Sequence, residues 1–93
     1  MANVTTGNHL YFDSAGSVSG RHRIIGLFWT GISGAEIVAD NDLSITDASG
    51  KSIIAKRAKS NGDDLGISPP LPMPVDGITI ATLDSGVVHI WLA

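Results

Sequence analysis

The 93-residue sequence contains no cysteine, which excludes disulfide bonds, thiolate metal sites and a thiol nucleophile. A chain of this length forms one domain and buries only about two-thirds of its unfolded surface. Nothing covalent can offset that thin margin of stability. The fold must therefore be held together by its apolar core.

Charge is also scarce. Charged residues make up 16% of the chain, whereas soluble domains typically carry about 25%. The net charge of −3 argues against an autonomous nucleic-acid-binding protein, which would present a basic face. The low charge density favours a protein that works against a partner. Two basic groups are interpreted as solvated strand faces or edges: Arg21 with Arg23, and Lys51, Lys56, Arg57 and Lys59.

Long apolar runs are absent too. The longest are a few residues, far short of the roughly 20 that span a bilayer, so no membrane partner is expected. Residues 1–8 are polar and lack the apolar stretch of a signal peptide, which favours synthesis in a cytoplasm. They also lack a strand pattern. We therefore predict a flexible N-terminal arm over residues 1–8 and a single domain over residues 9–93.

Helix patterns are nearly absent, because no apolar stripe of helical spacing follows a capping box. Instead, turn residues recur about every eight to twelve positions, between short runs rich in β-branched and aromatic residues. This spacing predicts an all-β fold. The expected architecture is a small antiparallel β-sandwich, jelly-roll or immunoglobulin-like, with about seven or eight strands and almost no helix. Strands are expected at 9–12, 22–30, 35–39, 43–47, 52–58, 78–83 and 87–92.

Local patterns place some of these strands further. Leu43 and Ile45 alternate with polar residues and should face the core. The register of 52–58 stays open, with either Ile53 and Ala55 or Ile54 inward. The last two strands are expected to form a hairpin around residues 84–86.

Two expected strands are apolar on both faces. Successive side chains of a strand point to opposite sides, so a sandwich with one core leaves one of these apolar faces outside. Either loops shield that outer face or another subunit covers it. Trp29 and Trp91 are interface candidates, because Trp is enriched in interface cores. The alternating sets are Ile25, Leu27 and Trp29 against Ile24, Gly26 and Phe28, and Val88, Ile90 and Leu92 against Val87, His89 and Trp91.

Residues 61–75 are expected to form a long loop that crosses between the two sheets, with prolines at 69, 70, 72 and 74. Proline fixes the backbone angle φ, so Leu71 and Met73 would be presented with little ordering entropy left to lose. Both residues are therefore candidates for contact with a partner. The alternative is that they plug one end of the sandwich.

No residue pattern indicates catalysis, a metal or a cofactor. The acidic stretches 40–42 and 63–64 are interpreted as turns, since they lack the glycine and distal glutamate of a calcium loop. His9, His22 and His89 are interpreted as ordinary strand histidines, because their spacing does not suggest a zinc site. There is neither a nucleophile elbow nor a phosphate-binding loop. The sequence therefore predicts a protein that is not an enzyme.

Three stretches, Gly20 to Gly31, Thr46 to Lys51 and Pro74 to Gly86, give the chain a family resemblance. It resembles short structural proteins of tailed bacteriophages. The resemblance implies a β-sandwich virion component, such as a capsid decoration or cement protein, a minor capsid protein, or a head–tail or fibre-attachment part. Such a protein would associate as a dimer or trimer and dock on a major capsid protein or another virion protein.

A carbohydrate- or ligand-binding β-sandwich module is the alternative function. In that case Trp29, Trp91 or Tyr11 would stack on a sugar ring. The two functions differ in where the aromatic residues lie. A binding module presents them in an open groove, whereas a structural protein buries them in a subunit contact.

Overall fold

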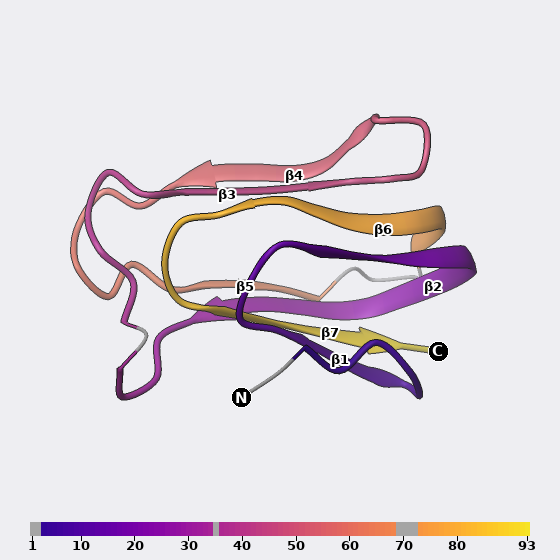
Figure 1. Ribbon diagram of the computed structural model, residues 1–93, viewed down its shortest axis with the longest axis horizontal. Coiled ribbons are helices and arrows are strands. Elements are labelled where there is room, and N and C mark those ends of the chain that lie inside the picture. The colour runs from indigo at the N-terminus through magenta and orange to yellow at the C-terminus, as the bar shows by residue number, and fades with distance from the viewer. Residues whose placement is uncertain (1–2, 35, 69–72) are drawn as a thin grey trace.

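The computed structural model describes residues 3–34, 36–68 and 73–93, and this part of the chain contains seven strands and no helix (Figure 1). With no helix there, the described chain has no helical segment able to cross a membrane. All strand pairs are antiparallel, so the predicted all-β antiparallel class is confirmed. The strands are β1 His9–Phe12, β2 Gly16–Thr30, β3 Asp42–Thr46, β4 Ser52–Arg57, β5 Leu65–Ile67, β6 Met73–Leu83 and β7 Val87–Leu92.

One continuous sheet contains all seven strands, in the order β1-β7-β2-β6-β3-β4, with β5 paired to β2 beside this path. The long strand β2 joins its two halves. Residues 16–24 of β2 pair with β6, and residues 24–30 pair with β7, with β5 against 27–29. Two separate sheets were expected, and the jelly-roll or immunoglobulin-like type is not confirmed.

The sheet turns a corner where β2 and β6 run side by side (Figure 1). The register between them shifts from Val18 to Arg21, and Gly20 and Gly77 both take positive φ there, at 91° and 83°. A bulge bends a strand, and glycine adopts this backbone conformation without steric cost. The corner brings the inner faces of both halves onto a single core.

That core is apolar and drawn from both halves. Leu43 and Ile45 of β3 are fully buried, as predicted from their alternation. Each such side chain contributes roughly 1.5–3 kcal/mol through burial. Trp29 is the largest buried side chain, and its Nε1 donates a hydrogen bond to the Ser85 carbonyl at 2.8 Å. The cluster comprises Leu10, Phe12, Ile24, Leu27, Trp29, Ile37, Leu43, Ile45, Ala58, Ile78, Ile80, Val88, Ile90 and Leu92.

The strand expected at 35–39 is wrong, because residues 36–39 form no strand. Ile37 is buried, but the backbone amides of the two residues after it donate hydrogen bonds to side chains and not to a neighbouring strand. The amide of Val38 donates to the Ser85 hydroxyl at 3.0 Å, and that of Ala39 donates to the Asn61 side-chain oxygen at 2.9 Å. A buried apolar residue was thus mistaken for a strand position.

The expected final hairpin is also wrong. β6 pairs with β2 and β3, whereas β7 pairs with β2 and β1, so the two strands enter different halves of the sheet. The loop expected at 61–75 is wrong in part, since it contains β5 and the start of β6. Both of these segments pair with β2.

The open register of β4 is resolved by a bulge between Ile45 and Thr46. Ile54 pairs with the buried Ile45 and therefore lies on the core side. Ile53 and Ile54 are both half-buried against the core, while Ala55 is exposed. The alternative with Ile54 inward therefore describes the strand better than the one with Ile53 and Ala55 inward, although the bulge leaves Ile53 half-buried as well.

Part of the predicted arm lies against β1. Val4 exchanges two backbone hydrogen bonds with Tyr11, at 2.8 and 2.9 Å. The Asn3 side-chain oxygen accepts a hydrogen bond from the amide of Asp13 at 2.9 Å. The Asn8 carbonyl accepts one from the amide of Leu92. The flexibility of the arm in solution stays a prediction.

Candidate functional site

A further bulge, between Ile24 and Gly26, sets which side chains of β2 face outward. It shifts the alternation, so that Ile24, Leu27 and Trp29 all point into the core. The expected grouping of Ile25 with Leu27 and Trp29 is therefore wrong. Ile25 is exposed at the bulge, and Phe28 lies outward with 40% of its surface exposed.

Five aromatic side chains meet on the outer side of β1, β7 and β2, and we call this surface the aromatic face. Tyr11 and Phe28 flank His89 across the sheet, and His9 pairs with Trp91 in the next row. Trp91 is 37% exposed, whereas Tyr11 is mostly buried. Exposed apolar patches are typical of interaction surfaces and ligand-binding grooves.

Phe28 lies over two glycines. A Cβ added to Gly26 would lie 3.3 Å from a ring carbon of Phe28, and one added to Gly66 of β5 would lie 3.1 Å from two of them. The ring meets Trp91 at 89° with centroids 5.3 Å apart. The Phe28 ring thus packs over Gly26 and Gly66, and the Trp91 indole stands perpendicular to it. Glycine at these two positions leaves room for the ring.

His9 and His89 are joined side chain to side chain across the strands. Nε2 of His9 lies 2.8 Å from Nδ1 of His89. The ring planes differ by 18° and the centroids are 5.1 Å apart, close to the nitrogen–nitrogen distance plus the two ring radii. The imidazoles therefore lie edge to edge in almost one plane. One must donate its N–H while the other accepts.

Trp91 stacks on this pair. Its indole lies 4.3 Å from the His9 ring with planes 11° apart. Burial lowers the pKa of His89 below its ordinary value, and a charge on neighbouring His9 lowers it further. Both effects disfavour a charge on His89 in the folded protein.

The predicted interface residues lie in different places. Trp91 is on the aromatic face, but Trp29 is fully buried, so its indole is unavailable to a partner of the folded chain. Met73 begins β6 opposite Ile24 and packs, half-buried, against the core. This position agrees with the plug interpretation for Met73. Leu71 lies outside the described residues.

From their spacing in the sequence, His9 and His89 were expected to be ordinary strand histidines. A signal was present, because each is followed two positions later by an aromatic residue, Tyr11 and Trp91. In a strand, residues two apart share a face. The pattern was visible, but the pairing of the two strands was not.

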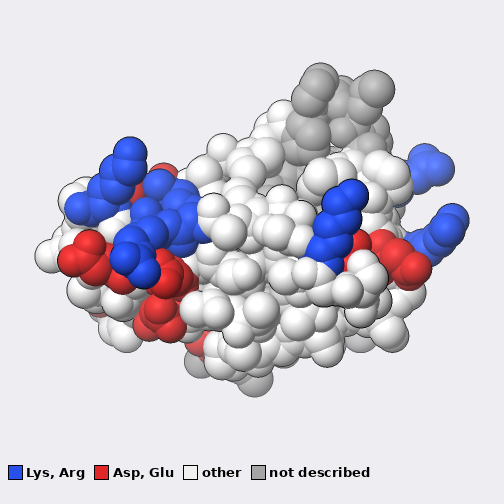
Figure 2. Space-filling view, turned by 90° about the horizontal axis from the view of Figure 1, so that it is seen from above, with Lys and Arg blue, Asp and Glu red and all other residues white. Residues whose placement is uncertain are grey.

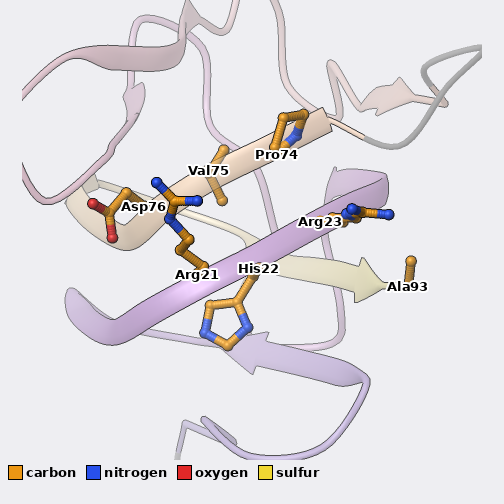
Figure 3. A pocket seen from close by; sticks show the side chains of 7 residues that line it. All are labelled: Arg21, His22, Arg23, Pro74, Val75, Asp76 and Ala93. Atoms are coloured by element: carbon orange, nitrogen blue, oxygen red, sulfur yellow. The ribbon is translucent and has the colours of Figure 1, made fainter.

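An open hollow of about 770 Å³ lies elsewhere, where the bent β2 runs beside the start of β6 (Figure 3). Its side chains do not converge. Arg21 lies beside Asp76, while His22 points to the other side of the strand, with its Nε2 3.0 Å from the Ser19 carbonyl. The described residues that line this hollow include no nucleophile aligned with a base, so it is a weaker candidate than the aromatic face.

Charged residues of both signs form two groups that are separated by uncharged surface in the view of Figure 2. Figure 2 shows Lys, Arg, Asp and Glu gathered toward two ends of this view. Arg57 donates two hydrogen bonds to Asp42, at 2.8 and 3.2 Å, which holds the pKa of that carboxyl below its usual value. Lys56 pairs with Asp63 at 3.1 Å. These acidic turns thus face basic side chains, and no cluster of three metal-ligating residues occurs in the described ranges.

Comparisons with known proteins give no match: no family model, no curated protein and no solved structure resembles this chain significantly. The role of the aromatic face is therefore inferred from the chemistry of its residues.

Proposed function

We propose that this chain is a non-enzymatic structural protein that docks on a second copy of itself through the aromatic face. The observation that carries the proposal is the exposure of Phe28 and Trp91, at 40% and 37%, side by side on the outer face of a sheet. Aromatic residues of this kind are enriched in interface cores, where charged residues are depleted.

The polar atoms of the face favour a protein partner over a sugar. Sugar recognition needs a free aromatic face together with side chains that bond hydroxyl groups. Here His9 and His89 use ring nitrogens on each other. Trp91 contacts aromatic rings from both strands that flank β7, namely His9 and Phe28. The carbohydrate-binding alternative therefore has less support.

Charge favours a second copy as the occupant. The chain has a net charge of −3, which opposes close approach of two copies over most orientations. The aromatic face contains no Lys, Arg, Asp or Glu, so two copies that meet there bring none of these charged side chains opposite each other. A two-fold contact uses the same patch on both sides.

The resemblance to phage structural proteins makes the virion the proposed setting, with synthesis in the host cytoplasm. The proposed part is a capsid decoration, cement-like or minor capsid protein of β-sandwich type, jelly-roll or immunoglobulin-like, that docks on a major capsid or other virion protein. A head–tail or fibre-attachment part is the alternative. Mass spectrometry of purified particles tests the setting, because decoration requires a copy number close to that of the shell protein.

The docking itself is tested by sedimentation equilibrium on the full chain. We expect a dimer at micromolar concentration, and a monomer after Phe28→Thr with Trp91→Thr. The matched control is Ile32→Thr with Val38→Thr, which removes similar exposed apolar side chains outside the aromatic face. A wild-type chain that stays monomeric, or a double variant that dimerises as the wild type does, would refute the proposal.

A further inference from the structure

The hydrogen bond between His9 and His89 lies in the middle of the aromatic face and ties edge strand β1 to β7. Its chemistry limits how many protons the pair can hold. One ring must present an N–H and the other a lone pair along the 2.8 Å line. A first added proton can sit on an outward nitrogen and leave the bond intact. A second proton puts N–H groups on both facing nitrogens and breaks it.

The surroundings offer little to offset such charge. On β1 the other titratable groups are Tyr11 and, just beyond the strand, Asp13. On β2 the exposed charged residue nearest in sequence to Phe28 is Arg23, which lies on the other side of the bulge at Ile24–Gly26. Asp64, just before β5, is also exposed. Phe28 and Trp91, the closest neighbours, are apolar rings. A second added proton would therefore place a positive charge beside an imidazolium whose nitrogen lies 2.8 Å away. The described residues of the aromatic face include no carboxylate that could offset this charge.

We propose that His9 and His89 form a proton-operated latch: the pair accepts one added proton with its hydrogen bond intact, and a second added proton breaks the bond and leaves two positive charges on the aromatic face. The consequence for docking rests on the proposed function, since a charged face on each copy repels its partner. Docking is then strong near neutrality and weak in acid.

The geometry fits a shared proton better than a metal ion. The rings are nearly coplanar with their nitrogens facing along one line. A zinc ion on that line would need the nitrogens about 4 Å apart, given zinc–nitrogen bonds of about 2 Å. The lowered pKa of His89, caused by burial and by His9, agrees with a disfavoured second proton.

The latch is tested first by NMR titration of the histidine rings in the full chain carrying His22→Asn, so that only His9 and His89 titrate. The pair should show two macroscopic midpoints at least about one pH unit apart, because strongly interacting groups titrate as a pair. In His89→Phe, His9 should titrate in a single step. Two independent titrations with one shared midpoint would overturn the latch.

Tryptophan fluorescence supplies a second readout. An imidazolium on His9 would face the Trp91 indole at 4.3 Å and quench it, so emission should fall on acidification. Trp91→Phe leaves only the buried Trp29, whose emission should stay constant over the same range. Equal pH dependence in both proteins would count against the latch.

Docking is measured by sedimentation at about pH 7.5 and about pH 5, which bracket the histidine range. We expect the dissociation constant of the dimer to rise at least tenfold from about pH 7.5 to about pH 5. This rise should be absent in the double variant His9→Phe with His89→Phe. The single variant His9→Phe is measured beside the double variant, because His9 is exposed and its replacement leaves the core unchanged. If no dimer forms at either pH, the proposed function fails while the ring titration still decides the latch. A coupled titration with unchanged dimer affinity would overturn proton control of docking.

Discussion

The ring of Phe28 occupies the space that a side chain at Gly66 would fill. A Cβ at Gly66 would come within 3.1 Å of two ring carbons, closer than ordinary contact. The aromatic face therefore depends on a glycine in the neighbouring strand β5, which pairs with Phe28 directly. This arrangement resembles the aromatic cover of sheet glycines that stabilises many β-proteins.

Gly66→Ala should lower stability by about 1 kcal/mol, because the added methyl group displaces Phe28. Urea denaturation followed by circular dichroism measures the change. In the Phe28→Ala background the same substitution should cost less, since the ring is gone. An equal cost in both backgrounds would show that Phe28 does not cause the effect.

Gly77→Ala should be among the more damaging glycine substitutions, with a loss of about 2 kcal/mol or more. Gly77 has φ of 83° at the sheet corner, and a Cβ there would lie 2.9 Å from the Cβ of Ala48. Gly50→Ala is the matched control, because it has φ of 87° and no atom within 4 Å of an added Cβ. Thermal melts of the two variants separate the steric cost from the backbone cost. Equal melting temperatures would contradict the contact with Ala48.

Trp29→Phe should destabilise the protein by about 1–3 kcal/mol, because the Ser85 carbonyl loses its 2.8 Å hydrogen bond and a cavity remains. Trp91→Phe is the control, since that indole is 37% exposed and donates no hydrogen bond that holds the core. Chemical denaturation measures both variants. A larger loss for Trp91→Phe would reverse the assignment of core and surface tryptophans.

Stability should fall as the solution is acidified through the histidine range. Folding lowers the pKa of His89 below its ordinary value of 6.5, first through burial and then through His9. Between the two pKa values the unfolded chain binds more protons, so the contribution is full above pH 6.5 and is lost as pH falls through the folded pKa. Melting temperatures of the wild type and His89→Phe across this range provide the test. The variant should have the flatter profile, and parallel profiles would contradict the role of His89.

Local patterns were sufficient to predict much of the strand content. The runs 9–12 and 87–92 are strands with the predicted bounds, and Leu43 and Ile45 face the core as their alternation indicates. These features depend on side-chain spacing within one strand, which the sequence displays directly. The candidate site was half visible in the same way, since Phe28 and Trp91 were placed on alternating faces of apolar strands.

The tertiary structure alone decided which face was outer and what met on it. The bulge at Ile24–Gly26 shifts the alternation of β2 and sends Trp29 inward, and no local pattern reveals it. Gly20 and Gly77 place the corner, yet glycine permits so many conformations that the sequence cannot say which one it takes. His9 and His89 are 80 positions apart, so their hydrogen bond depends on strand pairing. The sequence by itself determined a disulfide-free β domain, because composition and spacing are local properties; packing decided the aromatic face, because register and strand order arise from contacts between distant segments.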